Sequence, residues 1–392
     1  MVEDDGGRRP VTDIGTRTTP PPTDETAQLL GLAKEIAEGE LAPRADDFEA
    51  RGEFPRDVLR TLGAAGLLGL PYPEEFGGGG QPYEVYLQVI ETLAYRWLCV
   101  AQSVNVHTVA CHTLAGHGTD AQRQRHLAGM VGGQSLGANC LSEPEAGSDA
   151  TAVATTAVRD GDEYVLNGTK AWTTHAGVAD FYVVYCRTGK HSVRGLSCLL
   201  VDGGTAGVRP QRLEKKMGVR SSPTAQIVFA DARIPADRRI GREGGGFLVA
   251  MEAFDHGRLG IAACAVGLAQ AALDYAVAYA KTRRQFGQRI ISFQGLGFLL
   301  ADLATQVAAA RALVLSAARL RDSGRPFSVD AAKAKLFATD MAMRVTTEAV
   351  QVLGGYGYVA DHPVERWMRE AKLLQIVEGT NQIQRVVISR AL

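Results

Sequence analysis

The segment VEGTNQIQR at residues 377–385 places Glu378 directly before Gly379 and Thr380. Glycine often ends one helix and threonine often caps the next, so we expect Glu378 at a break between two helices. A carboxylate displayed from such a break can reach a neighbouring molecule and act as a general base. The spacing alone favours the simpler alternative, an exposed glutamate at a helix C-terminus.

Two other segments could hold a cofactor. Paired glycines follow an apolar helix in QVLGGYGY at 351–358, and they allow a ligand to approach the backbone closely. Arginines flank an aromatic residue in TRRQFGQRI at 282–290, a pattern that suits a pyrophosphate and a stacked ring. Each segment is also typical of an ordinary helix end with a turn.

Two further segments come earlier in the chain. LSEPEAGSD at 141–149 offers hydroxyl groups and backbone amides that could bind the polar edge of a ring. KAWTT at 170–174 places Trp172 among strand-forming residues, where its indole could cover a ring system. A loop rich in turn formers and a tryptophan of the core are the simpler alternatives.

The composition excludes several functional classes. The chain has 42 basic and 43 acidic residues and a formal net charge of -1, which argues against a binder of nucleic acid or of membrane surfaces. The six cysteines form no CxxC pair, so a disulfide framework or zinc site is not expected and a reducing cytosol fits. His107, His112 and His117 are five residues apart, a spacing that does not align metal ligands on one helix face.

The first and second halves of the chain predict different elements. We expect residues 1–23 to form a disordered tail without a secretory signal, and residues 24–135 to form a helical domain. Thirteen of the 15 prolines occur by Pro235 and none lies between Ala236 and Arg325, which leaves room for long helices there. Residues 241–392 are therefore predicted to form a helical bundle.

The middle segment, residues 136–240, has the alternating pattern of strands. Asp160-Gly161 and Asn167-Gly168 both lie between β-rich runs and predict two hairpins. No helical crossover separates the runs, so an antiparallel sheet or small barrel is expected. Beyond it, Leu259–Ala280 is apolar enough to suggest a membrane span, but Gln270 and Asp274 favour a buried bundle helix.

Taken in order, these segments resemble the acyl-CoA dehydrogenase family of flavoproteins, in its short- and medium-chain type. The resemblance covers about Asp24 to Leu392 and rests on LSEPEAGSD, NGTKAWTTHAG, MGVRSSPT, FDHGRLGIAA, RRQFG, FQ, QVLGGYGY and IVEGTNQIQR. It implies a mainly α fold with an N-terminal helical domain, a barrel-like middle β-domain and a C-terminal four-helix bundle. It also implies FAD, a homotetramer or sometimes a dimer with shared FAD sites, and an electron-transferring flavoprotein as partner.

By this resemblance Glu378 is the catalytic base. It removes the α-proton of an acyl-CoA thioester while a hydride leaves the β-carbon for the flavin, which gives a trans-2-enoyl-CoA. A free glutamate, with a pKa of about 4.3, is too weak a base, so burial should raise its pKa. Some branched-chain members carry the base at the position of Gly257, which has no side chain to act. In the family, the backbone N–H of the base and a ribityl hydroxyl of FAD stabilise the thioester oxygen.

The resemblance also assigns binding residues position by position. The expected FAD contacts are Leu141, Ser142, Trp172, Thr174, Arg283, Phe286, Gln294, Gln351, Gly354, Gly355, Thr380 and Gln382. Among these, Arg283 and Phe286 are expected to reach across to a neighbouring subunit. The expected substrate contacts are Ser148, Asp255, Arg258 and Gly379.

Three positions depart from the family pattern. Glu145 replaces a glycine, Val377 stands where several relatives have tyrosine, and His175 stands where asparagine is common. They affect loop shape and pocket width and remove no group that the chemistry needs. The expected function is therefore a cytoplasmic acyl-CoA dehydrogenase of lipid metabolism, with acyl length left open. The alternatives are a flavin monooxygenase or oxidase of the same fold acting on a non-CoA substrate, and a non-catalytic scaffold that binds CoA esters.

Overall fold

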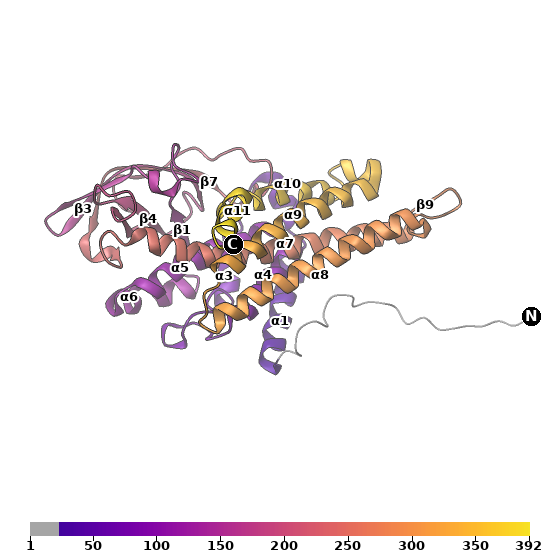
Figure 1. Cartoon of the computed structure of the whole chain (residues 1–392), viewed down its shortest axis with the longest axis horizontal. Helices are drawn as coiled ribbons and strands as arrows, with labels where there is room; N and C mark the ends of the chain where they lie inside the picture. Colours follow the sequence, from indigo (N-terminus) through magenta and orange to yellow (C-terminus); the bar gives the residue numbers. More distant parts are fainter. Residues whose placement is uncertain (1–22) are drawn as a thin grey trace, which may run out of the picture.

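A computed structural model describes residues 23–392 of the chain. It is elongated, with a sheet region at one end and a helical bundle that extends to the other (Figure 1). The tail predicted for residues 1–23 lies outside the described residues except for Thr23. That residue caps the first helix, because its hydroxyl accepts a hydrogen bond from the Thr26 amide at 3.2 Å.

The first part of the described chain is helical, as predicted. Its helices are α1 (Asp24–Ile36), α2 (Ala45–Arg51), α3 (Arg56–Ala64), α4 (Tyr83–Arg96), α5 (Leu98–His117) and α6 (Asp120–Val131), with short π and 3-10 turns η1 (Ala37–Leu41) and η2 (Glu74–Phe76). Thr119 and Gln122 form a capping box at the start of α6. Nearly all of α5 is buried between the sheet and the bundle, so its polar side chains need partners inside the protein.

The middle part forms an eight-stranded sheet in the order β6-β7-β3-β2-β4-β5-β8, with β1 paired to β4. The strands are β1 (Gly137–Cys140), β2 (Thr156–Asp160), β3 (Glu163–Thr174), β4 (Phe181–Arg187), β5 (Leu196–Asp202), β6 (Val208–Pro210), β7 (Thr224–Pro235) and β8 (Arg239–Ile240), with 3-10 turns η3 (Ala150–Ala152) and η4 (Ala236–Arg238). Most pairs are antiparallel, as expected, while β1 and β2 run parallel to β4.

The two predicted hairpins have different outcomes. The one at Asp160-Gly161 is confirmed, because Asp160 pairs with Glu163 across a turn in which Gly161 has a φ of 58°. The one at Asn167-Gly168 is wrong, since both residues lie inside β3 at an irregularity in its pairing with β7. A side chain at position 168 would overlap Thr155, so this glycine serves close packing and not a turn.

The last part contains five α-helices, a small hairpin and two 3-10 turns. They are α7 (Gly246–Thr282), β9 (Arg284–Gln285), β10 (Gln288–Arg289), η5 (Ile290–Ser292), α8 (Gln294–Asp322), α9 (Ser328–Leu353), η6 (Gly354–Tyr358), α10 (Val364–Leu374) and α11 (Asn381–Ser389). By length and composition α7 and α8 could each cross a membrane, but 72% of the apolar window of α7 is buried inside the protein. The prediction of a buried helix over Leu259–Ala280 is therefore confirmed.

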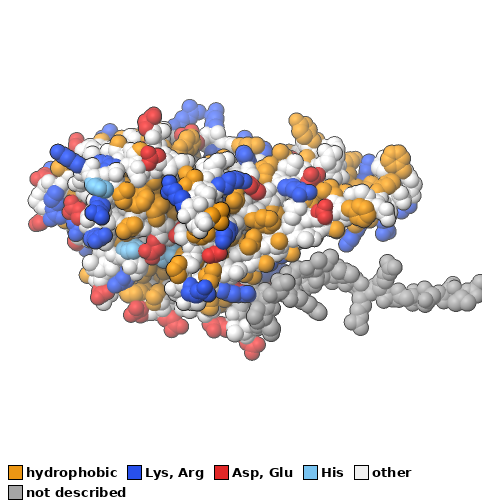
Figure 2. Space-filling view, viewed as in Figure 1, with side chains coloured by type: hydrophobic (Ala, Val, Ile, Leu, Met, Phe, Trp, Pro, Cys, Tyr) orange, Lys and Arg blue, Asp and Glu red, His pale blue; other side chains and the backbone are white. Residues whose placement is uncertain are grey.

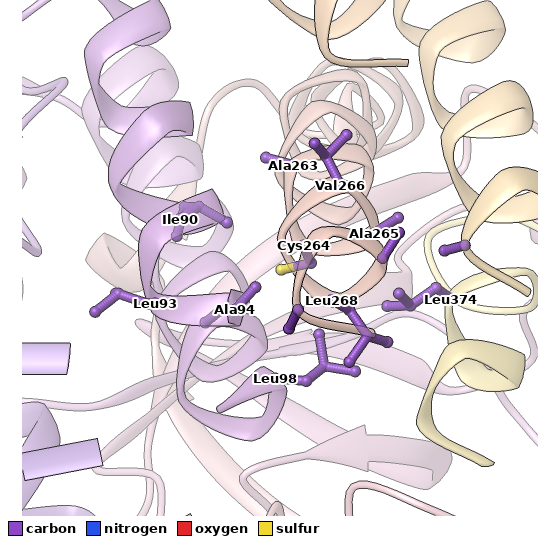
Figure 3. Close-up of a cluster of buried hydrophobic side chains, with 14 of the residues drawn as sticks. Ile90, Leu93, Ala94, Leu98, Ala263, Cys264, Ala265, Val266, Leu268 and Leu374 are labelled. Atoms are coloured by element: carbon purple, nitrogen blue, oxygen red, sulfur yellow. The ribbon is translucent and has the colours of Figure 1, made fainter. Parts of the chain in front are cut away.

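Small residues explain why α7 lies at the centre of the core. Its run of alanines, with Cys264 and Leu268, faces Ile90, Leu93 and Leu98 on one side and Leu374 on the other (Figure 3). A β-carbon at Gly267 would overlap the backbone of α4, so the two helices pack at close range. This packing holds the N-terminal half of α7 against α5 and the loop before α11, where the candidate site lies.

Candidate active site

Glu378 lies in the loop between α10 and α11. The helix before it ends at Leu374, so the prediction that Gly379 ends this helix is wrong. The chain instead bends through two consecutive residues with positive φ, 54° at Glu378 and 82° at Gly379. Thr380 then caps α11, as predicted, by accepting a hydrogen bond from the Ile383 amide at 3.3 Å. A left-handed glutamate costs conformational energy and occurs mostly where the surroundings impose it.

The bend turns the Glu378 carboxylate into the protein. Its Oε2 atom is buried and accepts no hydrogen bond from any residue between 23 and 392. Burial raises the pKa of Glu378 to about 7, although Arg258 and Lys335 act in the opposite direction. The alternative of an exposed glutamate at a helix end is therefore contradicted, and the carboxyl group is suited to exchange a proton near neutral pH.

Gly257 provides the space that this carboxylate occupies. A β-carbon at position 257 of α7 would lie 2.7 Å from Oε2 of Glu378 and 3.1 Å from a methyl group of Val109. Both distances are too short for any larger residue without rearrangement. The absence of a side chain at position 257 thus makes room for the carboxylate at position 378. This fits the expectation that the base is Glu378 and not a residue at position 257, where some branched-chain members carry it.

Arg258 lies beside the carboxylate and not at an open surface. Its side chain is buried and forms an ion pair with Asp255, which also accepts a hydrogen bond from the Ser328 hydroxyl at 3.0 Å. Burial raises the pKa of Asp255, while Arg258 opposes that shift. Two of the four expected substrate contacts therefore form a buried pair on the helix that carries Gly257. The other two, Ser148 and Gly379, lie on loops, and Ser148 is exposed.

Several expected flavin contacts lie on the sheet. Leu141 and Ser142 follow β1, and the Ser142 carbonyl accepts a hydrogen bond from the Ala171 amide at 2.8 Å. Trp172 has a φ of 59° where the pairing of β3 with β7 shifts register, and it is 66% exposed. The alternative of a core tryptophan is therefore wrong. An outward-facing indole on a strand fits a surface that covers a planar ring. Thr174 ends the same strand.

A buried ion pair that the sequence did not reveal supports this part of the sheet. Lys170, which is fully buried, donates to a Glu143 carboxylate oxygen at 2.8 Å and to the Leu141 carbonyl at 2.9 Å. Glu143 also accepts from the amides of Ala154 and Thr155 at 2.7 and 2.9 Å. These bonds fix the start of the LSEPEAGSD segment against β3. The missed signal is the lysine of KAWTT, whose partner lies 27 residues earlier.

The remaining expected flavin contacts form two groups. Thr380 and Gln382 lie beside Glu378, at the start of α11. The others lie at the far end of the bundle and are Arg283, Phe286, Gln294, Gln351, Gly354 and Gly355 (Figure 1). Phe286, in the turn of the β9–β10 hairpin, is 91% exposed. Arg283 follows Gly257 by 26 residues along α7, which corresponds to roughly 40 Å of helix. One chain therefore does not bring both groups to the same flavin ring.

Three buried polar residues behind the bend were also missed by the sequence reasoning. They are Lys335 on α9 and two residues of α11, Asn381 and Gln384. Lys335 and Gln384 donate to the Gly379 carbonyl of the bend, and Asn381 accepts a hydrogen bond from Lys335. Among residues 23–392, no group of three or more His, Cys, Asp or Glu residues could hold a metal ion. The chemistry that the described residues can supply is therefore acid–base chemistry at Glu378 beside an exposed aromatic surface.

Comparisons with known proteins match nearly the whole described chain. The three domains described as acyl-CoA dehydrogenase N-terminal, middle and C-terminal match residues 23–134, 138–232 and 244–392. A short-chain-specific acyl-CoA dehydrogenase of Clostridium acetobutylicum is 41% identical over 94% of this chain and 97% of its own length.

Two solved structures agree with this match. Butyryl-CoA dehydrogenase of Megasphaera elsdenii superposes with a TM-score of 0.93 at 41% identity, over 95% of this chain and 99% of that one. A chain from the structure described as the electron transferring flavoprotein of Acidaminococcus fermentans has the same TM-score at 43% identity, over 94% and 98%. Other solved relatives contain FAD. Fold, sequence and domain order agree, and the chain belongs to the acyl-CoA dehydrogenase family.

Proposed function

We propose that this protein catalyses the FAD-dependent α,β-dehydrogenation of a short-chain acyl-CoA thioester to the trans-2-enoyl-CoA, with Glu378 as the catalytic base. The observation that carries the proposal is the buried carboxylate of Glu378, whose Oε2 has no hydrogen-bond partner among the described residues and whose pKa burial raises to about 7. A general base is most effective when its pKa lies near the working pH. The short-chain preference rests on the printed substrate names of the relatives.

Proton removal needs more than the carboxylate. As the α-proton leaves, negative charge develops on the thioester oxygen, and hydrogen-bond donors aimed at that oxygen lower the barrier. The Glu378 amide is one candidate, because it donates to no other group in the part of the chain that the structure describes. The Glu378 amide and carboxylate both belong to the bend that the positive φ values of Glu378 and Gly379 form. Base and donor would thus move together.

The residues present fit FAD, which when bound would accept the hydride from the β-carbon. Leu141, Ser142, Trp172 and Thr174 would face the flavin ring from the sheet, and Thr380 and Gln382 from α11. Asp255, Arg258, Ser148 and Gly379 would contact the thioester and CoA. The expected residues at the far end of α7 would then bind the FAD of a neighbouring subunit, for which the exposed Phe286 is the main support.

We further propose a homotetramer in the cytoplasm that passes electrons to an electron-transferring flavoprotein. Apolar side chains reach the surface along the bundle (Figure 2). The exposed apolar residues of α8 include Phe298 and Leu313. A subunit interface would cover them, because exposed apolar patches often mark association surfaces. The partner flavoprotein is proposed because one of the most similar solved chains comes from a structure described by that name.

The experiment is a panel of acyl-CoA esters of increasing length and branching, added anaerobically to the purified holoprotein. Loss of the oxidised flavin absorbance, largest for esters of about four carbons, is the expected result. Aerobic addition of the same esters provides the control for the oxidase alternative, since slow reoxidation in air is expected of a dehydrogenase. No bleaching by any CoA ester, or rapid reoxidation by oxygen, would contradict the proposal.

A further inference from the structure

Lys335 is a buried cation without a carboxylate partner. Its side chain on α9 is fully buried, and Nζ donates to the Gly379 carbonyl at 3.0 Å and to Asn381 Oδ1 at 2.8 Å. No acidic group in the described chain lies within ion-pair distance of Nζ. Burying an ammonium group is costly unless its surroundings compensate. The lysine therefore needs an explanation beyond packing, and its position directly behind the bend at Glu378 provides one.

The carbonyl groups of the bend are held from behind. Gln384 Nε2 donates to the Gly379 carbonyl at 2.7 Å, so that oxygen accepts from both Gln384 and Lys335. Asn381 links Lys335 to Asp340 by donating to a carboxylate oxygen at 2.7 Å. A backbone with two consecutive positive φ values persists only when its surroundings determine it. Lys335 and Gln384 are the two side chains whose bonds to Gly379 meet this requirement.

The charges around Glu378 come from few elements. Arg258 faces it from α7 and is paired with Asp255, while Lys335 faces it from α9 with Asp340 behind Asn381. Tyr83 of α4 and Tyr185 of β4 are the nearby phenols, and burial raises the pKa of both. Because Arg258 is already paired, Lys335 is the cation near Glu378 without an acidic partner among the described residues. Burial lowers the pKa of Lys335 to about 7, and Glu378 opposes this shift.

We propose that Lys335 is a positioning residue for the dehydrogenation: its side chain fixes the Gly379 carbonyl from α9 and, in its protonated form, places a positive charge near the Glu378 carboxylate. This inference rests on the proposed function. The two effects are separable, because Gln384 binds the same carbonyl without a charge. Loss of the charge should make Glu378 harder to deprotonate, whereas loss of the neutral donor should disturb only its placement.

The test is the pH dependence of kcat/KM, which reports the ionisation of the base in the free enzyme. Wild type, Lys335→Met and Gln384→Leu are compared as holoproteins on the best ester of the panel, between about pH 5.5 and 9. We expect Lys335→Met to shift the rise in kcat/KM to higher pH by roughly one unit, which lowers the rate on the acidic side about tenfold. Gln384→Leu should lower kcat without moving the rise.

Lys333→Met is the matched control, because Lys333 is half-exposed on the same helix, and its profile should match that of wild type. If Lys335→Met does not fold, as judged by flavin content, Lys335→Gln carries the same expectation with a donor retained. A folded variant without the charge whose profile stays at the wild-type pH would overturn the role of Lys335. Absence of flavin reduction in wild type would instead count against the proposed function.

Discussion

Glu370 and Glu378 lie eight residues apart, and burial raises the pKa of each to about 7. Their partners differ. Glu370, on α10, accepts a hydrogen bond from Arg366 at 2.9 Å, one helical turn away, and Arg366 also binds Asp46 at 2.9 Å. Glu378 lies outside any helix and its carboxylate accepts no hydrogen bond from the described residues. A similarly raised pKa thus accompanies an ion pair on the fully buried Glu370 and a carboxyl group without a described hydrogen-bond partner on the partly buried Glu378.

The comparison shows that a raised pKa does not by itself indicate catalysis. Glu370 joins α10 to the N-terminal helices, since Arg366 reaches Asp46 of α2. Removing Glu370 would leave the buried Arg366 with the exposed Asp46 as its remaining acidic partner, so the pair is expected to matter for stability. Within residues 23–392, Glu378 has no hydrogen-bond partner to lose, and its carboxylate faces Gly257, which has no side chain. We therefore expect the burial of the Glu378 carboxylate to serve catalysis and not the stability of the fold.

The largest expected effect is on catalysis. Glu378→Gln should keep FAD and bind acyl-CoA but lose dehydrogenation by about 10²–10⁴ in rate, because the general base is absent. Flavin bleaching in a stopped-flow instrument measures this loss. Glu370→Gln is the matched control, and its rate per mole of bound FAD should remain near that of wild type. Equal losses in the two variants would end the distinction between the two carboxyl groups.

The next effect is on folding. Glu370→Ala should lower the free energy of unfolding by about 3–5 kcal/mol, since Arg366 would stay buried without its helical partner. Denaturant unfolding of the holoprotein measures this change. Arg369→Ala serves as the control, because its pair with Glu365 is partly exposed and should contribute about 1 kcal/mol or less. A loss below about 1 kcal/mol for Glu370→Ala would show that the buried pair is not needed.

Gly257→Ala should reduce turnover by about 10- to 100-fold. The new methyl group would lie 2.7 Å from the Glu378 carboxylate and force it out of place, and a displacement of about 1 Å can cost 10² in rate. Steady-state kinetics with the best ester measures the effect. Gly31→Ala on α1, where nothing lies within 4 Å, is the control and should be neutral. Unchanged turnover would mean that the carboxylate reacts from another position.

Burial raises the pKa of both glutamates to about 7, so linkage alone gives both the same pH dependence of stability, and only the ion pair of Glu370 with Arg366 can separate the two variants in thermal unfolding at pH 8. The pKa of Glu378 is about 7 in the folded protein against 4.5 as its ordinary value, so its contribution to stability is fully present below about pH 4.5 and lost as pH rises through 7. Glu378→Gln should therefore raise Tm at pH 8, by roughly 1–3 °C, and have little effect at pH 4.5. Glu370→Gln, which loses an ion pair, should lower Tm at pH 8. The same sign for both variants would contradict the contrast.

The smallest effect is expected at Glu145, which departs from the family pattern. Its side chain is exposed, in a loop whose conformation is fixed by the Lys170–Glu143 pair. Glu145→Gly should therefore change the free energy of unfolding by about 0.5 kcal/mol or less. Denaturant unfolding beside wild type measures it. Glu143→Gln, which weakens the buried pair, should cost more, and the reverse order would mean that Glu145 holds the loop.

Local signals predicted much of this structure. The cap at Thr380, the hairpin at Gly161 and the long helix after Ala236 follow from short-range rules. The hairpin prediction at Asn167-Gly168 was wrong because this glycine is required by close packing with Thr155, which contacts it from outside the strand. Close approach between separate segments leaves no local pattern.

The ordered motifs pointed to Glu378 as the candidate base, and this assignment stays a prediction. The burial of its carboxylate was not visible in its own segment. Lys335 and Lys170 were missed because a lysine in a helix or strand is usually an exposed residue. Their partners lie 44 and 27 residues away in the sequence. Side chains that act from behind a site are thus the part that sequence patterns did not reveal.

The length of α7 has a genetic consequence. Glu378 and the Phe286 hairpin lie near opposite ends of this helix. A chain mutated at one of these positions would therefore still contribute intact residues to a flavin site at the other end. Under the proposed shared flavin sites, two inactive alleles, one at Glu378 and one at Phe286, should complement each other when co-expressed. Mixed assemblies would then contain a minority of flavin sites in which the residues from both contributing chains are unmutated.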